Sequence, residues 1–272
     1  MLNRVKALFL KIEPKHIVML AGLIVLGSFF MIYLIDMQNV LGTRDFLMTR
    51  GQEYPYFWYH WYRNTGPMEM LQYATLGAAA FFAIKNASLL TTRENNMFWS
   101  ILGVAYLFML IEDAASPRHR IRQYVGLIAG EEGQGTFGTL TELVYFAVLA
   151  AIPVYALLRY GLGILSNFKS SRTYMLLGFV VYAMAAGASF AGSAFDSLMN
   201  TNVYTVLGEN LFHFMIRFSD GQITQVYLDN QTFISFFLMD APVEESIELM
   251  GASLMLAAGL AFRREVQRRN KS

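Results

Sequence analysis

The chain has 272 residues, of which 55% are hydrophobic and only 15% are charged, and its mean hydropathy is +0.38. Soluble domains usually carry about 25% charged residues, so this composition excludes an ordinary water-soluble fold. The chain contains no cysteine. Disulfides, thiolate nucleophiles, thiolate zinc sites and covalent attachment of c-type haem are therefore excluded.

Residues 1–15 carry four basic side chains among apolar ones and predict an amphipathic helix on the cytoplasmic membrane surface. Six apolar stretches of about membrane length predict an all-α integral membrane protein with six transmembrane helices. These stretches are 17–35, 68–84, 97–111, 143–158, 174–195 and 243–262. The predicted transmembrane domain covers 16–264, and a basic cytoplasmic tail, 265–272, follows it. Residues 233–239 either lie at the outer interface or begin a long sixth helix, which Pro242 would start or kink.

Lysine and arginine set the predicted orientation. With the N-terminus in the cytoplasm, 14 of the 21 Lys and Arg residues fall in cytoplasmic segments. By contrast, 17 of the 20 Asp and Glu residues lie outside or near the outer boundary. We therefore expect a protein of the inner or plasma membrane, surrounded by the lipid bilayer, with both termini cytoplasmic. The predicted outer loops, 37–67, 113–141 and 197–232, are the longer ones and are expected to carry the function.

The six predicted spans pair as three similar helical hairpins, each with acid at its outer end and one histidine in its outer loop. Glu69, Glu142 and Glu248 lie 16, 17 and 15 residues before the basic residue that closes their spans. At 1.5 Å per residue, each lies about 22–26 Å above the inner boundary of a hydrocarbon core about 30 Å thick. A carboxylate at this depth is costly unless it faces protein, water or a positive partner.

This acidic level predicts a site on the outer side, which binds a divalent metal ion. The residues predicted to hold the metal are Asp113, His119, Asp196, Glu244 and Glu248. Mixed carboxylate and histidine ligands suit Zn, Mn or Fe, whereas carboxylates alone suit Ca or Mg. The further intramembrane carboxylates are Glu69, Glu112, Glu142 and Glu245. Arg118 and Arg120 are expected to neutralise neighbouring carboxylates. An alternative interpretation of Glu244 and Glu245 is that they are helix N-terminal acids, which complement the helix macrodipole.

The fifth predicted span is rich in Gly, Ala and Ser and is expected to be the central packing helix of the bundle. No span has a histidine near its middle, which argues against haem held between helices. The chain has no nucleotide-binding or hydrolase motif. Nothing beyond ordinary basic flanks predicts nucleic-acid binding.

Three hypotheses for the function remain open, and the pattern names no reaction. The first is a metal-binding membrane protein acting on a lipid or lipid-linked substrate. The second is a non-catalytic accessory or scaffold subunit, whose outer loops bind other membrane-protein subunits of a larger complex. The third is a proton- or cation-coupled transporter. The inner halves of the predicted spans argue against it, because they are nearly free of ionisable groups.

Overall fold

The computed structural model describes residues 13–49, 56–63, 65–199, 203–219 and 231–270, without the side chains of 47–48, 131–136 and 191–199. Most of this part of the chain is helical, and it contains no strand. The longer helices are α2 (Pro14–Ile32), α5 (Pro67–Ala87), α6 (Arg93–Ala115), α7 (Pro117–Ala156), α9 (Lys169–Met199), α10 (Val203–Arg217) and α13 (Glu244–Arg269). The shorter ones are η1 (Tyr33–Met37), η2 (Val40–Gly42), α3 (Thr43–Thr49), α4 (Phe57–Tyr62), η3 (Leu157–Gly161), α8 (Leu162–Leu165), α12 (Gln231–Leu238) and η4 (Met239–Val243).

Within the described residues, five helical segments are long and apolar enough to cross a membrane. They are Pro14–Met37, Arg93–Ala115, Phe137–Leu165, Lys169–Phe190 and Gln231–Arg269. These segments overlap five of the six predicted spans, which agrees with an all-α membrane protein.

The predicted span at 68–84 is also helical, as part of α5, but it is less apolar than the other five. The reason is that α5 carries polar side chains, several of which are buried against other helices rather than facing outward. Gln72 and Asn86 are fully buried, and Glu69 is buried too. Because these polar groups face the bundle interior, the outward face of α5 stays apolar although its average apolarity is lower.

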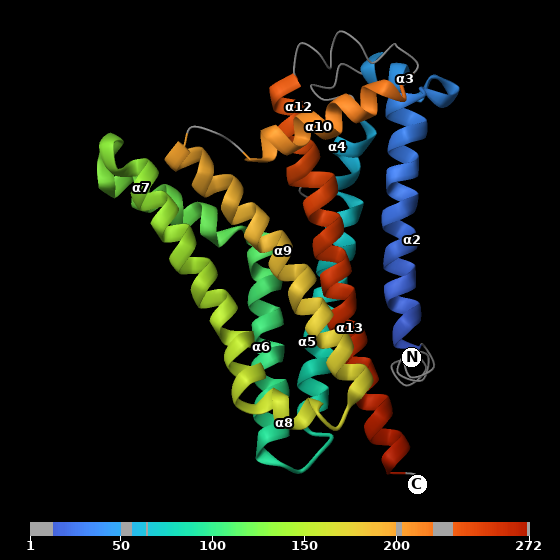
Figure 1. Cartoon of the computed structure of the whole chain (residues 1–272), viewed down its shortest axis with the longest axis vertical. Coiled ribbons are helices and arrows are strands. Elements are labelled where there is room, and N and C mark those ends of the chain that lie inside the picture. The colour runs from blue at the N-terminus through green and yellow to red at the C-terminus, as the bar shows by residue number, and fades with distance from the viewer. Residues whose placement is uncertain (1–12, 50–55, 64, 200–202, 220–230, 271–272) are drawn as a thin grey trace.

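The long helices run side by side along the longest axis of the molecule (Figure 1). The start of α2, the end of α13 and the short connection between α5 and α6 lie at one end of the bundle. Helices α10 and α12 cover the opposite end, where α10 crosses the bundle nearly at right angles to its axis. Predicted outer segments therefore gather at the end away from both termini.

Helix α13, rather than α9, is the central helix. In its most apolar window 78% of the residues are buried, against 17% in α9. The expectation that the small residues of α9 mark the central helix is therefore wrong. They instead allow α9 to approach α13 closely, because a Cβ atom at Gly178 would lie 3.0 Å from Met255 Cγ.

The α12, η4 and α13 segments form one continuous helical stretch, Gln231–Arg269. Pro242 lies in the π-helical segment η4, where the widened turn accommodates a residue without a backbone N–H. Of the two predicted alternatives, the long sixth helix is thus the one observed.

The half of the bundle nearer the termini contains a dense apolar core. It contains Trp99 and Phe262, whose ring centroids lie 4.8 Å apart, together with Leu76 and Met255. The buried Asn86 amide donates a 2.8 Å hydrogen bond to a backbone carbonyl of α13. Its polar side chain therefore ties helices together inside this core.

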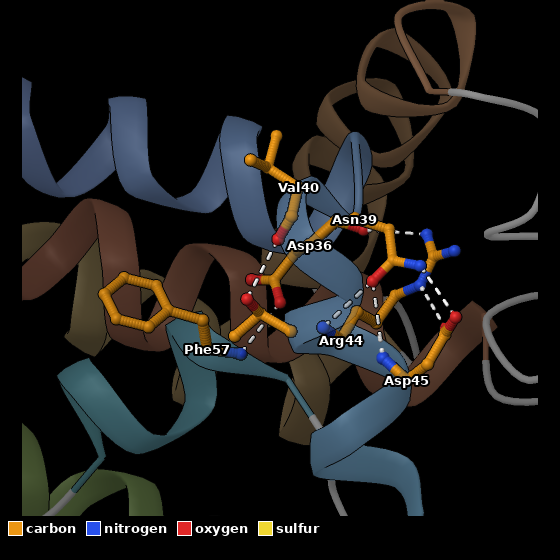
Figure 2. A network of polar contacts seen from close by, with 7 residues as sticks. Asp36, Asn39, Val40, Arg44, Asp45 and Phe57 are labelled. Atoms are coloured by element: carbon orange, nitrogen blue, oxygen red, sulfur yellow. Dashed lines mark hydrogen bonds and ion pairs between the residues drawn. The ribbon is translucent and has the colours of Figure 1, made fainter.

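Asp36 fixes the position of the short helix α4, as Figure 2 shows. Its fully buried carboxylate accepts hydrogen bonds from the backbone N–H groups of Phe57 (2.8 Å) and Trp58 (3.1 Å) at the start of α4. Arg44, itself buried, donates to the Asp36 carbonyl oxygen at 3.2 Å and pairs with Asp45 at 3.6 Å. A carboxylate from one helix thus caps the N-terminus of another.

Candidate functional site

An acidic chamber of about 510 Å³ lies between α4, α5, α6, α7, α9, η4 and α13, at the end of the bundle away from both termini. Seven carboxylates line it: Glu69, Glu112, Asp113, Asp240, Glu244, Glu245 and Glu248. Against them stand two arginines, Arg63 and Arg118, and one histidine, His119. If every carboxylate is ionised, the lining carries a large excess of negative charge, so the chamber favours positively charged groups or protons.

The chamber is assembled from the helix ends that lie away from both termini, and the directions of these helices alternate. Helix α5 begins at this end, with Pro67 in its first turn, and α6 ends here at Ser116, which adopts a left-handed conformation (φ 44°). Helix α13 contributes its first turns. Acids at the starts of α5 and α13 complement the helix dipoles, whereas Glu112 and Asp113 at the end of α6 oppose theirs.

Gln72 joins two of the carboxylates at the base of the chamber. Its side-chain nitrogen donates hydrogen bonds to Asp113 Oδ2 at 2.8 Å and to Glu248 Oε2 at 2.6 Å. Tyr182 donates to the same Asp113 oxygen at 2.9 Å, and Tyr73 donates to the Asp113 carbonyl at 2.9 Å. Helices α5, α6, α9 and α13 therefore meet through one hydrogen-bonded group.

Arg118 is the main positive group on the α7 side of the chamber. Its guanidinium pairs with Glu112 at 3.4 Å, donates to Ser189 at 3.3 Å and stacks 4.6 Å from the Phe146 ring centroid. It also lies 3.1 Å from His119 Nε2. Partial burial, and then the nearby Arg118 charge, lower the pKa of His119, which favours the neutral ring as hydrogen-bond acceptor.

The other chamber acids have separate partners. Glu244 accepts a hydrogen bond from the Tyr204 hydroxyl on α10, and Glu69 accepts one from the Thr65 backbone N–H. Burial of Tyr204 beside this carboxylate raises the pKa of its phenol. Glu245 Oε2 is buried without a hydrogen-bond partner among the described atoms. Apart from Asp113 and Glu248, which meet at the Gln72 nitrogen, the chamber acids therefore do not share a partner.

The structure brings together four of the five predicted metal ligands as chamber lining, namely Asp113, His119, Glu244 and Glu248. The fifth, Asp196, has a side chain outside the described part. Within the described residues, however, no three His, Asp or Glu side chains are grouped closely enough to hold a metal ion. His119 instead contacts Arg118, and Glu244 contacts Tyr204.

Glu142 and Arg120 do not line the chamber. Glu142 is fully buried and pairs with Arg122 at 3.2 Å, and this pair lies between the two helical stretches of α7 that meet at Gly130. Arg120 is exposed and forms no ion pair with the residues that the structure describes. Of the two arginines expected to neutralise carboxylates, Arg118 is the one with a carboxylate partner.

An apolar groove of about 460 Å³ lies between α7 and α9, next to the acidic chamber. Its lining is almost entirely aliphatic and aromatic and includes Leu143 and Val154, which are exposed on the surface of the bundle. The residues that line both cavities are Met109, Phe146, Leu149, Tyr182 and Ala186. A polar cavity and an apolar one thus share a wall.

Four residues that line the chamber, and one that contacts its lining, were not predicted from the sequence. The four are Gln72, Tyr182, Ser189 and Asp240, and the fifth is Tyr204, which donates to Glu244. Gln72 had a detectable signal, because it lies three residues after Glu69 and so on the same helix face. Tyr182 lies among apolar and small residues, and nothing in its surroundings in the sequence distinguishes it from a packing residue.

Comparisons with known protein families, with curated proteins and with solved structures each find no match to this chain. Its function therefore has to be argued from the geometry of the chamber and the groove.

Proposed function

We propose that this chain is an integral membrane protein that binds an amphiphilic, lipid-like ligand from the outer side of the inner or plasma membrane. The polar head group would lie in the acidic chamber and the hydrocarbon chain in the apolar groove. The observation that carries this proposal is the shared wall between the two cavities, which gives one site with a polar and an apolar half.

The charge of the chamber favours a ligand whose head group is positive. Seven carboxylates line the chamber with only two arginines, and carboxylates inside a low-dielectric bundle need protons or cations. A primary ammonium group can donate three hydrogen bonds, and the chamber is rich in acceptors. Long-chain amines are therefore suitable probe ligands.

The proposed orientation follows from the distribution of charge and from the shape of the bundle. Most of the Lys and Arg residues that the structure describes belong to the end where both termini lie, and this end is expected to be cytoplasmic. The acidic chamber then faces outward. In this arrangement α5, with 21 residues and its polar side chains inside, provides the sixth crossing.

Transport across the membrane is less well supported than binding. Beneath the chamber lie the apolar side chains Leu76, Tyr106 and Met255, which belong to the dense inner core. An ion or polar solute leaving the chamber inward would have to enter this core. The geometry therefore favours a binding site that is open on one side of the membrane. If the protein is an enzyme, the reaction would take place at the head group of the ligand, because the head group is the part that lies among the ionisable side chains.

Native mass spectrometry of the purified protein tests the proposal. The probes are a single-chain primary amine and the alcohol of the same chain length. We expect both to bind, with the amine binding about tenfold or more tightly, because only the amine is attracted by the carboxylates.

Gly187 allows the groove to be blocked without disturbing the backbone. A Cβ atom at Gly187 would meet nothing within 4 Å, so Gly187→Leu should fill the groove rather than push α9 aside. Gly22→Leu is the matched control, because Gly22 has the same free space but lies on α2, far along the chain from the groove. Weaker binding of both probes by G187L alone would support the proposal. Equal binding by wild type, G187L and G22L would contradict it.

A further inference from the structure

The base of the acidic chamber contains a buried oxygen atom that has no partner. Gln72 is fully buried, and its nitrogen lies between Asp113 and Glu248, at 2.8 and 2.6 Å. Its oxygen, Oε1, has no hydrogen-bond partner among the described atoms. Buried polar atoms are nearly always partnered, so this oxygen needs an explanation.

Rotation of the Gln72 amide by half a turn exchanges its nitrogen and oxygen with little change in shape. With nitrogen inward, the amide supplies hydrogen bonds to the two carboxylates. With oxygen inward, three oxygen-bearing groups from α5, α6 and α13 face one point. Tyr182, which donates to Asp113 at 2.9 Å, would then hold that carboxylate in place.

We propose that Asp113, Glu248 and the Gln72 amide oxygen together bind a hard divalent cation such as Ca²⁺ or Mg²⁺. Such cations prefer carboxylate and amide oxygens and complete their coordination with water, which the open chamber can supply. Two carboxylates also balance the charge of one divalent ion. This cation site rests on the proposed function, because ions reach it only if the chamber opens to the outer side of the membrane.

This site differs from the one predicted from the sequence. Asp113 and Glu248 belong to both, but His119 contacts Arg118 and is not a ligand here. The third protein ligand is an amide oxygen, so the absence of a group of three His, Asp or Glu side chains in the described part does not conflict with it. A donor set of oxygens alone favours Ca²⁺ or Mg²⁺ over Zn²⁺.

The experiment uses the full chain in detergent, treated with chelator and then titrated with CaCl₂ or MgCl₂, while thermal unfolding and calorimetry follow binding. We expect saturable binding of one ion and a rise in the unfolding temperature. Asp113→Asn and Glu248→Gln should each weaken binding about tenfold or more. Gln72→Glu should strengthen it, because it adds a third carboxylate. Glu142→Gln should leave it unchanged, because Glu142 is a buried carboxylate outside the chamber.

The proposal is overturned if wild type binds neither ion at millimolar concentration, or if D113N and E248Q bind as tightly as wild type does. Where these two variants do not fold, Q72E decides, and equal or weaker binding by Q72E overturns the proposal. Amine binding measured in chelator separates the two ideas. If the amine binds but neither Ca²⁺ nor Mg²⁺ binds, only the cation site is refuted. If one of these ions binds but the amine does not, only the proposed binding of an amphiphile is refuted.

Discussion

Replacing Asp36 by Ala should detach α4 from the wall of the acidic chamber. The Asp36 carboxylate accepts two backbone hydrogen bonds, at 2.8 and 3.1 Å, and is fully buried. A hydrogen bond to a charged group contributes about 1.5–3 kcal/mol, and the variant would leave two N–H groups without their partner. We therefore expect a loss of about 3 kcal/mol. Asp36→Asn keeps one acceptor but turns an NH₂ group toward the other donor, and should lose about 2 kcal/mol.

The assay is reversible unfolding in mixed micelles, followed by tryptophan fluorescence. The chain has three tryptophans, of which Trp58 and Trp61 lie in α4 and Trp99 lies in the inner core. Trp99→Phe therefore makes the emission report on α4 alone. Asp45→Asn is the control, because the Asp45 side chain is 59% exposed and the Asn side chain keeps an acceptor oxygen for the buried Arg44. It should change stability by less than about 0.5 kcal/mol. If Asp36→Ala is as stable as this control, Asp36 does not hold α4 in place.

Three further predictions concern other parts of the bundle. Arg122→Ala leaves the fully buried Glu142 without its 3.2 Å partner and should cost about 3 kcal/mol in the same unfolding assay, at the low end for a buried pair because the Arg122 side chain is 34% exposed. An apolar replacement of both residues should recover most of the loss. Gly208→Ala would place a Cβ atom 1.7 Å from the Ser235 carbonyl oxygen, so α10 should separate from α12 and become open to limited proteolysis. His119 has a pKa below its ordinary 6.5 in the folded protein, because of burial and a neighbouring guanidinium. As the pH falls, the unfolded chain therefore protonates His119 before the folded protein does. The contribution of His119 to the free energy of unfolding is complete above about pH 6.5 and is lost as the pH falls toward the folded pKa.

Each of these predictions has a control or a contradicting result. The double replacement at the buried ion pair should be more stable than Arg122→Ala, and equal stability would show that the unpaired charge is not the cause. Gly187→Ala, where nothing lies within 4 Å, should leave proteolysis unchanged. The stability difference between wild type and His119→Gln should vary with pH only below about 6.5. A difference that does not depend on pH would contradict the shifted pKa.

The sequence predicted most of the fold because length and apolarity identify membrane-type helices directly. Five predicted spans correspond to apolar helices of the structure, and Pro242 lies inside one continuous helical stretch. The central helix was misassigned, because small residues allow close packing without indicating which helix lies in the middle. The small residues of α9 pack against the buried residues of α13, as the contact between Gly178 and Met255 shows.

Counting residues from the basic ends of the spans predicted the level of the candidate site but not its membership. Glu69 and Glu248 lie at the predicted level and line the chamber, whereas Glu142, counted in the same way, pairs with Arg122 instead. Helical depth is fixed by 1.5 Å per residue, but the direction of a side chain depends on how neighbouring helices pack. The turn at Gly130, which brings Arg122 back beside Glu142, depends on a backbone conformation of φ 71° that the sequence did not reveal.

The central claim, an outward-facing acidic chamber, is tested most directly by the reactivity of single cysteines toward membrane-impermeant thiol reagents. The chain has no native cysteine, so Ser189→Cys in the chamber and Ser170→Cys, beside residues close to both termini, each give one reactive thiol. In intact cells the account predicts labelling at 189 and none at 170. It also predicts that a cationic reagent reacts about tenfold or more faster than an anionic one at 189, and that a long-chain amine protects this position. Labelling at 170 alone, or equal rates for both reagents at 189, would contradict it.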